Sequence, residues 1–337
     1  MPSSEPLVSV LLPAFDAAAT LELALRSVAR QSLSAFECVV VDNGSRDATH
    51  SLAEKFATLD ARFRVVTESE RGIVPALRAG LLACRGRYVA RMDADDVMHR
   101  RRLELQLAYL EQRPALVGAG CHVRFFPRRA LTDGMRAYER WLNGIDGPAR
   151  VREEAFVECP IAHPTLVIRR ELLTDFGYRD AGWPEDYDLV LRLLAAGHEL
   201  GVVPRRLLGW RDGPARLSRT ASEYRTERIV ACKAVFLCQT LLRDHPRYAL
   251  WGYGDTGRLL ARELATHGRT PELIVELHPG RIGQRIAGAR VIAPSELRTL
   301  PKRPLVASVA GAVARDQIRA ALFEMGYAET LDFVCAA

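Results

Sequence analysis

The sequence lacks the uninterrupted apolar run of roughly 18 residues that a membrane-spanning helix requires. It also lacks a basic segment at its beginning, so its first short apolar run predicts a strand rather than a signal peptide. Its 7 cysteines are odd in number and scattered, which is typical of free buried thiols and argues against a disulfide framework or a zinc site. We therefore expect a cytoplasmic protein without a transmembrane segment.

Lysine is scarce, because only Lys55, Lys233 and Lys302 accompany the arginines. The net charge of +6 is shared evenly: residues 1–244 carry 35 basic and 32 acidic side chains, and residues 245–337 carry 12 and 9. Neither part has the charge asymmetry of a nucleic-acid-binding arm, so we expect no nucleic-acid partner. Local arginine clusters leave peripheral contact with the inner face of the membrane open, although most such clusters are solvated surface.

Strands and helices alternate through the first 100 residues. This pattern predicts an α/β fold with a mostly parallel sheet and helices on both faces. Ligands of such sheets bind beyond the carboxyl ends of the strands. The predicted strands are Leu7–Leu12, Glu37–Val41, Phe63–Thr67 and Tyr88–Met92, with a helix over Ile73–Ala83.

Three carboxylates, Asp93, Asp95 and Asp96, follow the fourth predicted strand. Unpaired charges at the end of a buried strand are costly, so we expect a positively charged partner beside them. Hard oxygen ligands suit Mg²⁺ or Mn²⁺, which complete their shell with substrate phosphates. The alternative is that Asp96 caps the helix carrying Leu103, which would explain one aspartate but not three.

We predict an amphipathic helix over residues 222–244 as the end of the first domain. A second domain is expected after a break at Asp244, which divides the chain into residues 1–244 and 245–337. The pattern Gly252-x-Gly254-x-x-Gly257 lies between a predicted strand and a helix, with Glu276 about 20 residues further on. This arrangement predicts a small Rossmann-like α/β domain. The glycines indicate either a second nucleotide site or a turn that packs a helix close to the sheet.

Several motifs occur in the order and spacing of one catalytic domain. Together they resemble the inverting family 2 glycosyltransferases of the GT-A type, over roughly residues 5–220. The matching segments are Val8–Phe15, Val39–Asp47, Arg71–Ile73, Ala90–Asp96 and Glu185–Asp188.

The resemblance implies that Asp95 is the direct ligand of a Mn²⁺ or Mg²⁺ ion on the donor diphosphate, with Asp93 supporting the metal or the ribose. It also implies a nucleotide site, in which Arg211 would contact phosphate. The family commonly has a second aspartate where this chain has Asn43, so a UDP-sugar is favoured but other bases stay open. The residues expected to border the nucleotide are Pro13, Phe15, Asp42, Asn43 and Arg71.

An inverting transfer needs one general base, and the resemblance assigns it to Asp186, with Glu185 beside it. A carboxylate at a helix N-terminus is kept ionised by the helix dipole, although first-turn acids also simply stabilise a helix. Trp183 and His163 are candidate acceptor contacts, or else core residues. The acceptor is expected to be a glycan or a lipid-linked group.

The resemblance therefore predicts a metal-dependent glycosyltransferase of cell-surface polysaccharide or glycoconjugate synthesis. One alternative is a sugar-nucleotide-modifying or NAD-dependent oxidoreductase that uses residues 245–337, but no Tyr-x-x-x-Lys pair follows the glycines. Another is a non-catalytic nucleotide-sugar sensor, against which the intact acidic residues argue.

Overall fold

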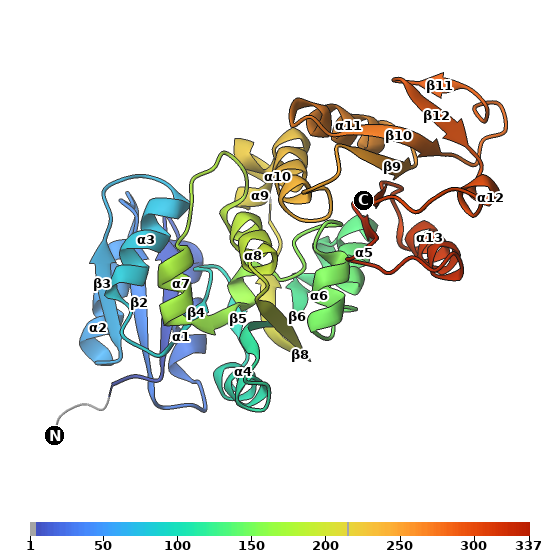
Figure 1. Cartoon of the computed structure of the whole chain (residues 1–337). Helices are drawn as coiled ribbons and strands as arrows, with labels where there is room; N and C mark the ends of the chain where they lie inside the picture. Colours follow the sequence, from blue (N-terminus) through green and yellow to red (C-terminus); the bar gives the residue numbers. More distant parts are fainter. Residues whose placement is uncertain (1–4, 214–215) are drawn as a thin grey trace. The chain divides into compact units, whose positions relative to one another are not determined.

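The computed structural model describes residues 5–213 and 216–337 (Figure 1). Contacts within the chain group it into two compact units. The first contains residues up to Val151, Ile161–Ala181 and Ala196–Arg216. The second contains Arg152–Pro160, Gly182–Ala195 and Leu217–Ala337, so it is assembled from three separate stretches of chain.

The first unit is built on an eight-stranded sheet of order β3-β2-β1-β4-β7-β6-β8-β5. Strands β3, β2, β1 and β4 are parallel, whereas β7 runs antiparallel to both of its neighbours. The predicted mostly parallel sheet is confirmed. Its strands are β1 (Val8–Ala14), β2 (Phe36–Asp42), β3 (Phe63–Thr67), β4 (Tyr88–Arg91), β5 (Val97–Met98), β6 (Leu116–Phe126), β7 (Val167–Arg169) and β8 (Glu199–Arg211).

Helices connect these strands, and their apolar faces are buried; α1, for example, buries Leu21, Leu25 and Val28. This spacing of three and four residues is the signature of an amphipathic helix. The helices before β9 are α1 (Ala18–Ala29), α2 (Thr49–Leu59), α3 (Ile73–Ala83), α4 (Arg102–Glu111), α5 (Asp133–Leu142), α6 (Pro148–Glu154), α7 (Arg170–Phe176), α8 (Glu185–Ala195), α9 (Leu217–Thr220) and α10 (Thr226–Gln239), with single 3-10 turns at Arg128–Ala130, His163–Thr165 and Ser222–Tyr224.

A six-stranded sheet of order β11-β12-β10-β9-β13-β14 forms the end of the chain, and we call it, with its helices, the C-terminal sheet. All neighbours are parallel except β11 and β12. Starting at β9, the chain adds β10 and β12 on one side and then β13 and β14 on the other, which is the Rossmann-like order expected. Its elements are β9 (Arg247–Trp251), α11 (Asp255–Thr266), β10 (Thr270–Val275), β11 (Arg285–Ile286), β12 (Ala289–Ile292), α12 (Pro294–Leu297), β13 (Leu305–Ala307), α13 (Ala312–Glu324) and β14 (Phe333–Cys335).

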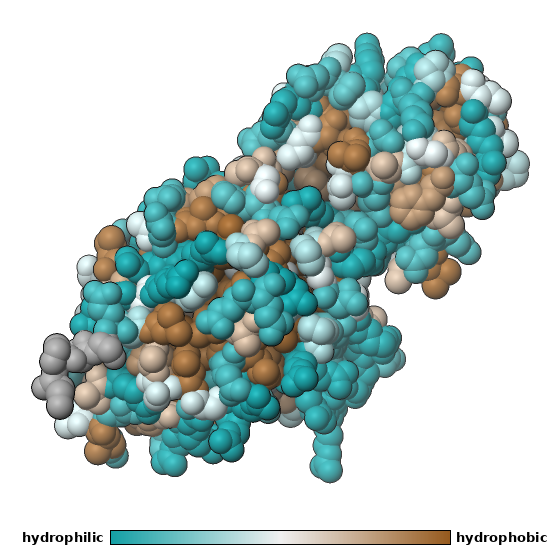
Figure 2. Space-filling model, turned by 60° about the horizontal axis from the view of Figure 1, so that its bottom comes forward, coloured by the Kyte–Doolittle hydropathy of each residue, from teal (hydrophilic) through white to brown (hydrophobic). Residues whose placement is uncertain are grey.

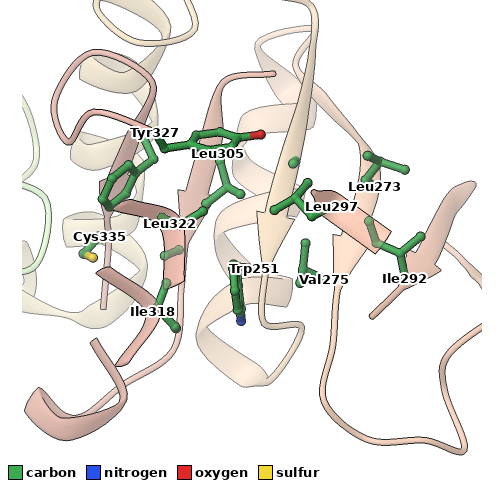
Figure 3. Close-up of a cluster of buried hydrophobic side chains, with 13 residues drawn as sticks. Trp251, Leu273, Val275, Ile292, Leu297, Leu305, Ile318, Leu322, Tyr327 and Cys335 are labelled. Carbon is green, nitrogen blue, oxygen red and sulfur yellow. The ribbon is translucent and has the colours of Figure 1, made fainter. Parts of the chain in front are cut away.

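Apolar side chains of the C-terminal sheet form a continuous buried cluster (Figure 3). Trp251 of β9 lies at its centre, between side chains from β10 and α13. Val157, which is distant in sequence, also packs against this cluster. The second sheet therefore has its own hydrophobic core, as an independent layer of structure requires.

The structure excludes the alternative explanation of Asp96 and corrects one predicted helix. Asp96 does not cap a helix, because β5 intervenes and α4 begins at Arg102, preceded by Arg101. The long helix expected over residues 222–244 is shorter, since α10 covers Thr226–Gln239 and follows a separate 3-10 turn. The first correction removes the structural explanation for one of the three clustered aspartates.

Hydrophilic residues predominate on the face of the protein shown in Figure 2, with hydrophobic residues in patches between them. Within residues 5–213 and 216–337, no helix has the length and apolar character needed to cross a membrane.

Helix α3 packs closely on β1 and β2 at Gly80. A Cβ atom placed there would lie 2.2 Å from Leu11 Cδ1 and 2.6 Å from Val41 Cγ2. Gly134 offers a contrast, because the nearest atom to a Cβ there is Thr132 Oγ1 at 3.8 Å. Overpacking a filled core forces displacement of the backbone or of side chains.

We therefore predict that Gly80→Ala lowers the free energy of unfolding by about 1–3 kcal/mol. Gly134→Ala should leave it unchanged or raise it by up to about 1 kcal/mol, because alanine favours the helical conformation. Urea unfolding followed by circular dichroism measures both variants. Equal stability of the two proteins would contradict the close packing of α3.

Candidate active site

Three polar segments leave the first sheet at the same edge. In the parallel register, Ala14 of β1 lies opposite Asp42 of β2, and Leu11 lies opposite Arg91 of β4. The chain beyond β1 continues to Phe15, and the chain beyond β4 continues to Asp93. Because parallel strands end together, the register brings these predicted residues to one edge, where ligands of α/β sheets bind.

Asp93, Asp95 and Asp96 form an acidic cluster at this edge. Each offers a carboxylate oxygen, and these oxygens lie within 4.8 Å of one another. Asp96 is buried, and its Oδ1 accepts a hydrogen bond from the main-chain N–H of Arg211 at 2.7 Å. Its buried Oδ2 has no hydrogen-bond partner among the residues described. An all-carboxylate set with an unsatisfied buried oxygen fits a hard divalent cation.

Arginines surround the cluster, as the expected need for positive charge requires. The buried guanidinium of Arg91 forms an ion pair with Asp93, with 2.6 Å between Nη2 and Oδ1. Arg211 Nε donates a 2.7 Å hydrogen bond to the carbonyl of Asp95, and its guanidinium lies 4.6 Å from the centre of the Phe126 ring. Arg211, the residue predicted to contact phosphate, is therefore hydrogen-bonded to the main chain of the acidic loop.

The cluster perturbs the proton affinity of its members. Burial, with the neighbouring charge of Asp93, raises the pKa of Asp95 to about 6, although Arg211 and Arg216 act in the opposite direction. Burial and the charges of Asp93 and Asp95 also raise the pKa of Asp96 well above its ordinary value. Both shifts mean that the fold disfavours the full set of negative charges without a bound cation.

Phe15 and Arg71 form a cation–π pair at the same edge of the sheet as the acidic cluster. Phe15 is 45% exposed, and the guanidinium carbon of Arg71 lies 4.2 Å from the centre of its ring. Arg71 Nη2 also donates to the carbonyl of Gly44 at 3.0 Å. An exposed aromatic ring and a guanidinium plane are both surfaces on which a nucleobase can stack. Pro13 precedes this pair within β1.

Asp42 is buried, and its carboxylate contacts His50 and the main chain of Ser45. Its Oδ2 lies 3.2 Å from Nδ1 of His50, and its Oδ1 accepts the N–H of Ser45 at 3.3 Å. His50 was not among the predicted site residues, and only its place eight residues after Asp42, within the first turn of α2, could have indicated it. The structure adds it to the candidate nucleotide site.

Asn43 holds a loop rather than facing open space. Its Nδ2 donates to the carbonyls of Glu68 and Glu70 at 3.2 and 2.6 Å, and its Oδ1 accepts the N–H of Gly72 at 2.8 Å. These bonds fix the loop that carries Arg71. The departure from the second aspartate of the family therefore acts on loop geometry.

His163 is buried in the first unit. Its Nε2 lies 3.1 Å from the hydroxyl of Tyr178, and the two ring centres are 5.5 Å apart. This environment agrees with the structural interpretation of His163 more closely than with an acceptor contact.

Glu185 and Asp186, the residues predicted to supply the general base, belong to the second unit. They lie in the first turn of α8. The hydroxyl of Tyr224 donates to Glu185 Oε2 at 3.3 Å. Trp183 donates its indole N–H to Asp188 at 3.1 Å, and Asp188 is also paired with Arg192 at 2.6 Å. The side chain of Asp188 therefore stabilises α8 and its N-terminal flank through these local bonds.

The glycine turn follows β9 as expected. A Cβ at Gly257 would lie 2.4 Å from the carbonyl oxygen of Gly252, and Gly252 itself has φ of +91°. A Cβ at Gly254 would meet nothing within 4 Å. Packing and backbone conformation thus require two of the three glycines, whereas Gly254 borders open space at the start of α11.

The fold and the acidic cluster define a nucleotide-sugar glycosyltransferase with a GT-A-type sheet. The model for "Glycosyl transferase family 2" matches residues 9–177, and the chain belongs to this family.

Similar proteins include the amylovoran biosynthesis glycosyltransferase AmsE of Erwinia amylovora, which is 32% identical over 195 residues covering 57% of this chain and 71% of AmsE. A putative teichuronic acid biosynthesis glycosyltransferase of Bacillus subtilis, TuaG, is 35% identical over 34% of this chain and 45% of its own length.

Solved structures confirm the fold. S. aureus TarS (residues 1–349), in complex with UDP, aligns with a TM-score of 0.52 at 18% identity, over 77% of this chain and 71% of TarS. The mannosyltransferase PcManGT of Pyrobaculum calidifontis, in complex with GDP-Man and Mn²⁺, aligns with a TM-score of 0.52 at 20% identity, over 79% and 71%.

Because the pKa of Asp95 is raised, its ionisation destabilises the metal-free protein as the pH rises through about 6. We predict that Asp95→Asn raises the melting temperature by about 2–6 °C at pH 8, with little difference from wild type near pH 4. Mn²⁺ with UDP should stabilise the wild type but not the variant. Differential scanning calorimetry measures both effects.

Asp255→Asn serves as the control, because Asp255 is exposed and remote in sequence from the cluster. A variant of Asp95 that keeps full stabilisation by Mn²⁺ and UDP would remove this residue from the metal site.

Proposed function

We propose that the protein transfers a sugar from a nucleoside diphosphate donor, with a UDP-sugar favoured, to a hydroxyl of a glycan or lipid-linked acceptor with inversion at the anomeric carbon. The observation that carries this proposal is the acidic cluster with its surrounding arginines. Asp95 and Asp93 would hold a divalent ion, Mn²⁺ or Mg²⁺, and a bound ion would supply positive charge to offset the charge of the departing diphosphate.

The chain's own residues prepare the leaving group. Arg211, fixed by its bonds to the acidic loop, directs its remaining N–H groups to phosphate oxygens, because a guanidinium matches their geometry. Arg216 adds positive charge near Asp95 and Asp96. The guanidinium groups of Arg211 and Arg216 stabilise the additional negative charge that develops on the diphosphate as its bond to the sugar breaks.

The nucleoside is bound by the residues of the nucleotide site. Its base stacks against Phe15 and Arg71, and Asp42, oriented by His50, accepts an N–H of the base. Asn43 contributes through the loop of Arg71, and Pro13 borders the site. Uracil offers an N–H to such a carboxylate, as the proposal of a UDP-sugar donor requires.

Asp186 is the proposed general base, with Glu185 as its neighbour. It accepts the proton of the acceptor hydroxyl as the oxygen attacks the anomeric carbon, and the first turn of α8 favours its ionised form. Trp183 and His163 stay weaker candidates for acceptor contact, since both are hydrogen-bonded locally.

The acceptor class rests on the relatives. AmsE is named for amylovoran biosynthesis, and TuaG for teichuronic acid biosynthesis. Both names support a role for this chain in the synthesis of a cell-surface polysaccharide or glycoconjugate.

A panel of nucleotide sugars tests the donor. We predict that release of nucleoside diphosphate is fastest with a UDP-sugar, requires Mn²⁺ or Mg²⁺, and stops on addition of EDTA. Asp42→Ala should weaken binding of the UDP-sugar by about 10-fold or more, through loss of a hydrogen bond to a charged group. Highest activity with a GDP-sugar would contradict the proposal that the nucleotide site prefers uracil.

The base is tested by Asp186→Asn, which keeps the shape of the side chain but cannot accept the proton. Its transfer rate should fall by about 100-fold or more, while its affinity for UDP with Mn²⁺ stays unchanged. Glu185→Gln is the matched control and should retain most of the activity. Normal turnover in Asp186→Asn combined with an inactive Glu185→Gln would assign the base to Glu185.

A further inference from the structure

The stretch Arg152–Pro160, which we call the bridging segment, is distant in sequence from the C-terminal part of the second unit, yet an apolar contact and an ion pair join the two. Val157 packs against the hydrophobic cluster of the C-terminal sheet. Glu154, which is 1% exposed, forms an ion pair with Arg319 of α13 at 3.0 Å. Arg319 is anchored in turn by two bonds of 2.9 Å to Glu329.

Lys233 of α10 adds a third link. Its ammonium donates to the carbonyl of Val157 at 2.9 Å and to the carbonyl of Ala336 at 3.1 Å. It therefore joins the bridging segment to the residue that follows β14. A buried ammonium is unfavourable unless it is hydrogen-bonded, and burial lowers the pKa of Lys233. Both carbonyls would lose a buried partner if this side chain were shortened or made apolar.

The bridging segment also binds the helix of the proposed base. Tyr187, the residue after Asp186, is 1% exposed, and its hydroxyl donates to the carbonyl of Ala155 at 2.7 Å. Two carbonyls of this short stretch, those of Ala155 and Val157, therefore accept hydrogen bonds from different helices. Ala155 is bound by α8, and Val157 is bound by α10, while Glu154 is held by α13.

We propose that the C-terminal sheet positions the first turn of α8, and with it Asp186, through the bridging segment. This inference rests on the proposed function, because it takes Asp186 as the base. Tyr187, Lys233 and Arg319 are positioning residues: they act on the reaction only through the orientation of Asp186. A base displaced by a fraction of an ångström loses efficiency while donor binding in the first unit is unaffected.

The first variant is Tyr187→Phe, which removes one hydrogen bond and no carbon atoms. We expect its kcat for transfer to fall by about 10-fold, with affinity for UDP and Mn²⁺ within about twofold of the wild type. Tyr248→Phe is the matched control, because the hydroxyl of Tyr248 is buried in β9 and has no hydrogen-bond partner within the described part of the chain. It should leave kcat unchanged.

The second variant is Lys233→Met, which keeps the length of the side chain and removes its charge. It should lower kcat to a similar extent, and Lys233→Arg should restore part of the loss. Lys302→Met, which removes a lysine bound to the carbonyl of Gly326 at the surface, is the control. If both variants act on one bridge, the double variant Tyr187→Phe/Lys233→Met should be little worse than either single one.

Hydrogen exchange measured by mass spectrometry on the full chain gives a readout besides activity. The amides of α8 should exchange faster in Tyr187→Phe and Lys233→Met than in either control. Wild-type kcat in both variants, or an equal loss of kcat and of UDP affinity, would overturn the inference. An active Asp186→Asn would instead remove the proposed base, and the exchange data would still report on the bridge.

Discussion

The mutual repulsion of three carboxylates is the constraint on which the first unit's site depends. Asp93, Asp95 and Asp96 are brought within 4.8 Å by the turn after β4, and burial makes the charges of Asp95 and Asp96 more costly. Arg91 and Arg211 offset part of this cost through the ion pair and the bond to the acidic loop. Because the two arginines do not offset all of the repulsion, the fully ionised cluster is unfavourable without a bound cation.

The sequence predicted the parts of this arrangement that follow from local pattern. Strands β1 to β4 and helix α3 were recognised because their apolar runs are short, regular and bounded by polar residues. The acidic cluster was recognised because three carboxylates after a buried strand have few structural explanations. The register that aligns Ala14 with Asp42 follows from the parallel sheet, so the convergence at one edge was also predictable.

Other parts depend on contacts between distant residues and could not be read from the pattern. Nothing near Asn43 in the sequence indicates that its amide binds the main chain at Glu68, Glu70 and Gly72. The pairing of His50 with Asp42 likewise depends on how α2 packs. The region of residues 113–160 has mixed signals, and β6 is recognisable only from its pairing with β7 and β8.

The discontinuous composition of the second unit has a consequence for the order of folding. Arg319 reaches the main chain at Glu153 across 166 residues, and Lys233 reaches Ala336 across 103. Contacts between residues this far apart in sequence form late in folding, because closing a long loop of chain costs conformational entropy. During synthesis from the ribosome, α8 emerges well before the strands that complete its surroundings. Helix α8 therefore gains its full set of packing partners only when β14 has been made, so a chain truncated before β14 would fold its candidate nucleotide site while the surroundings of α8 stay incomplete.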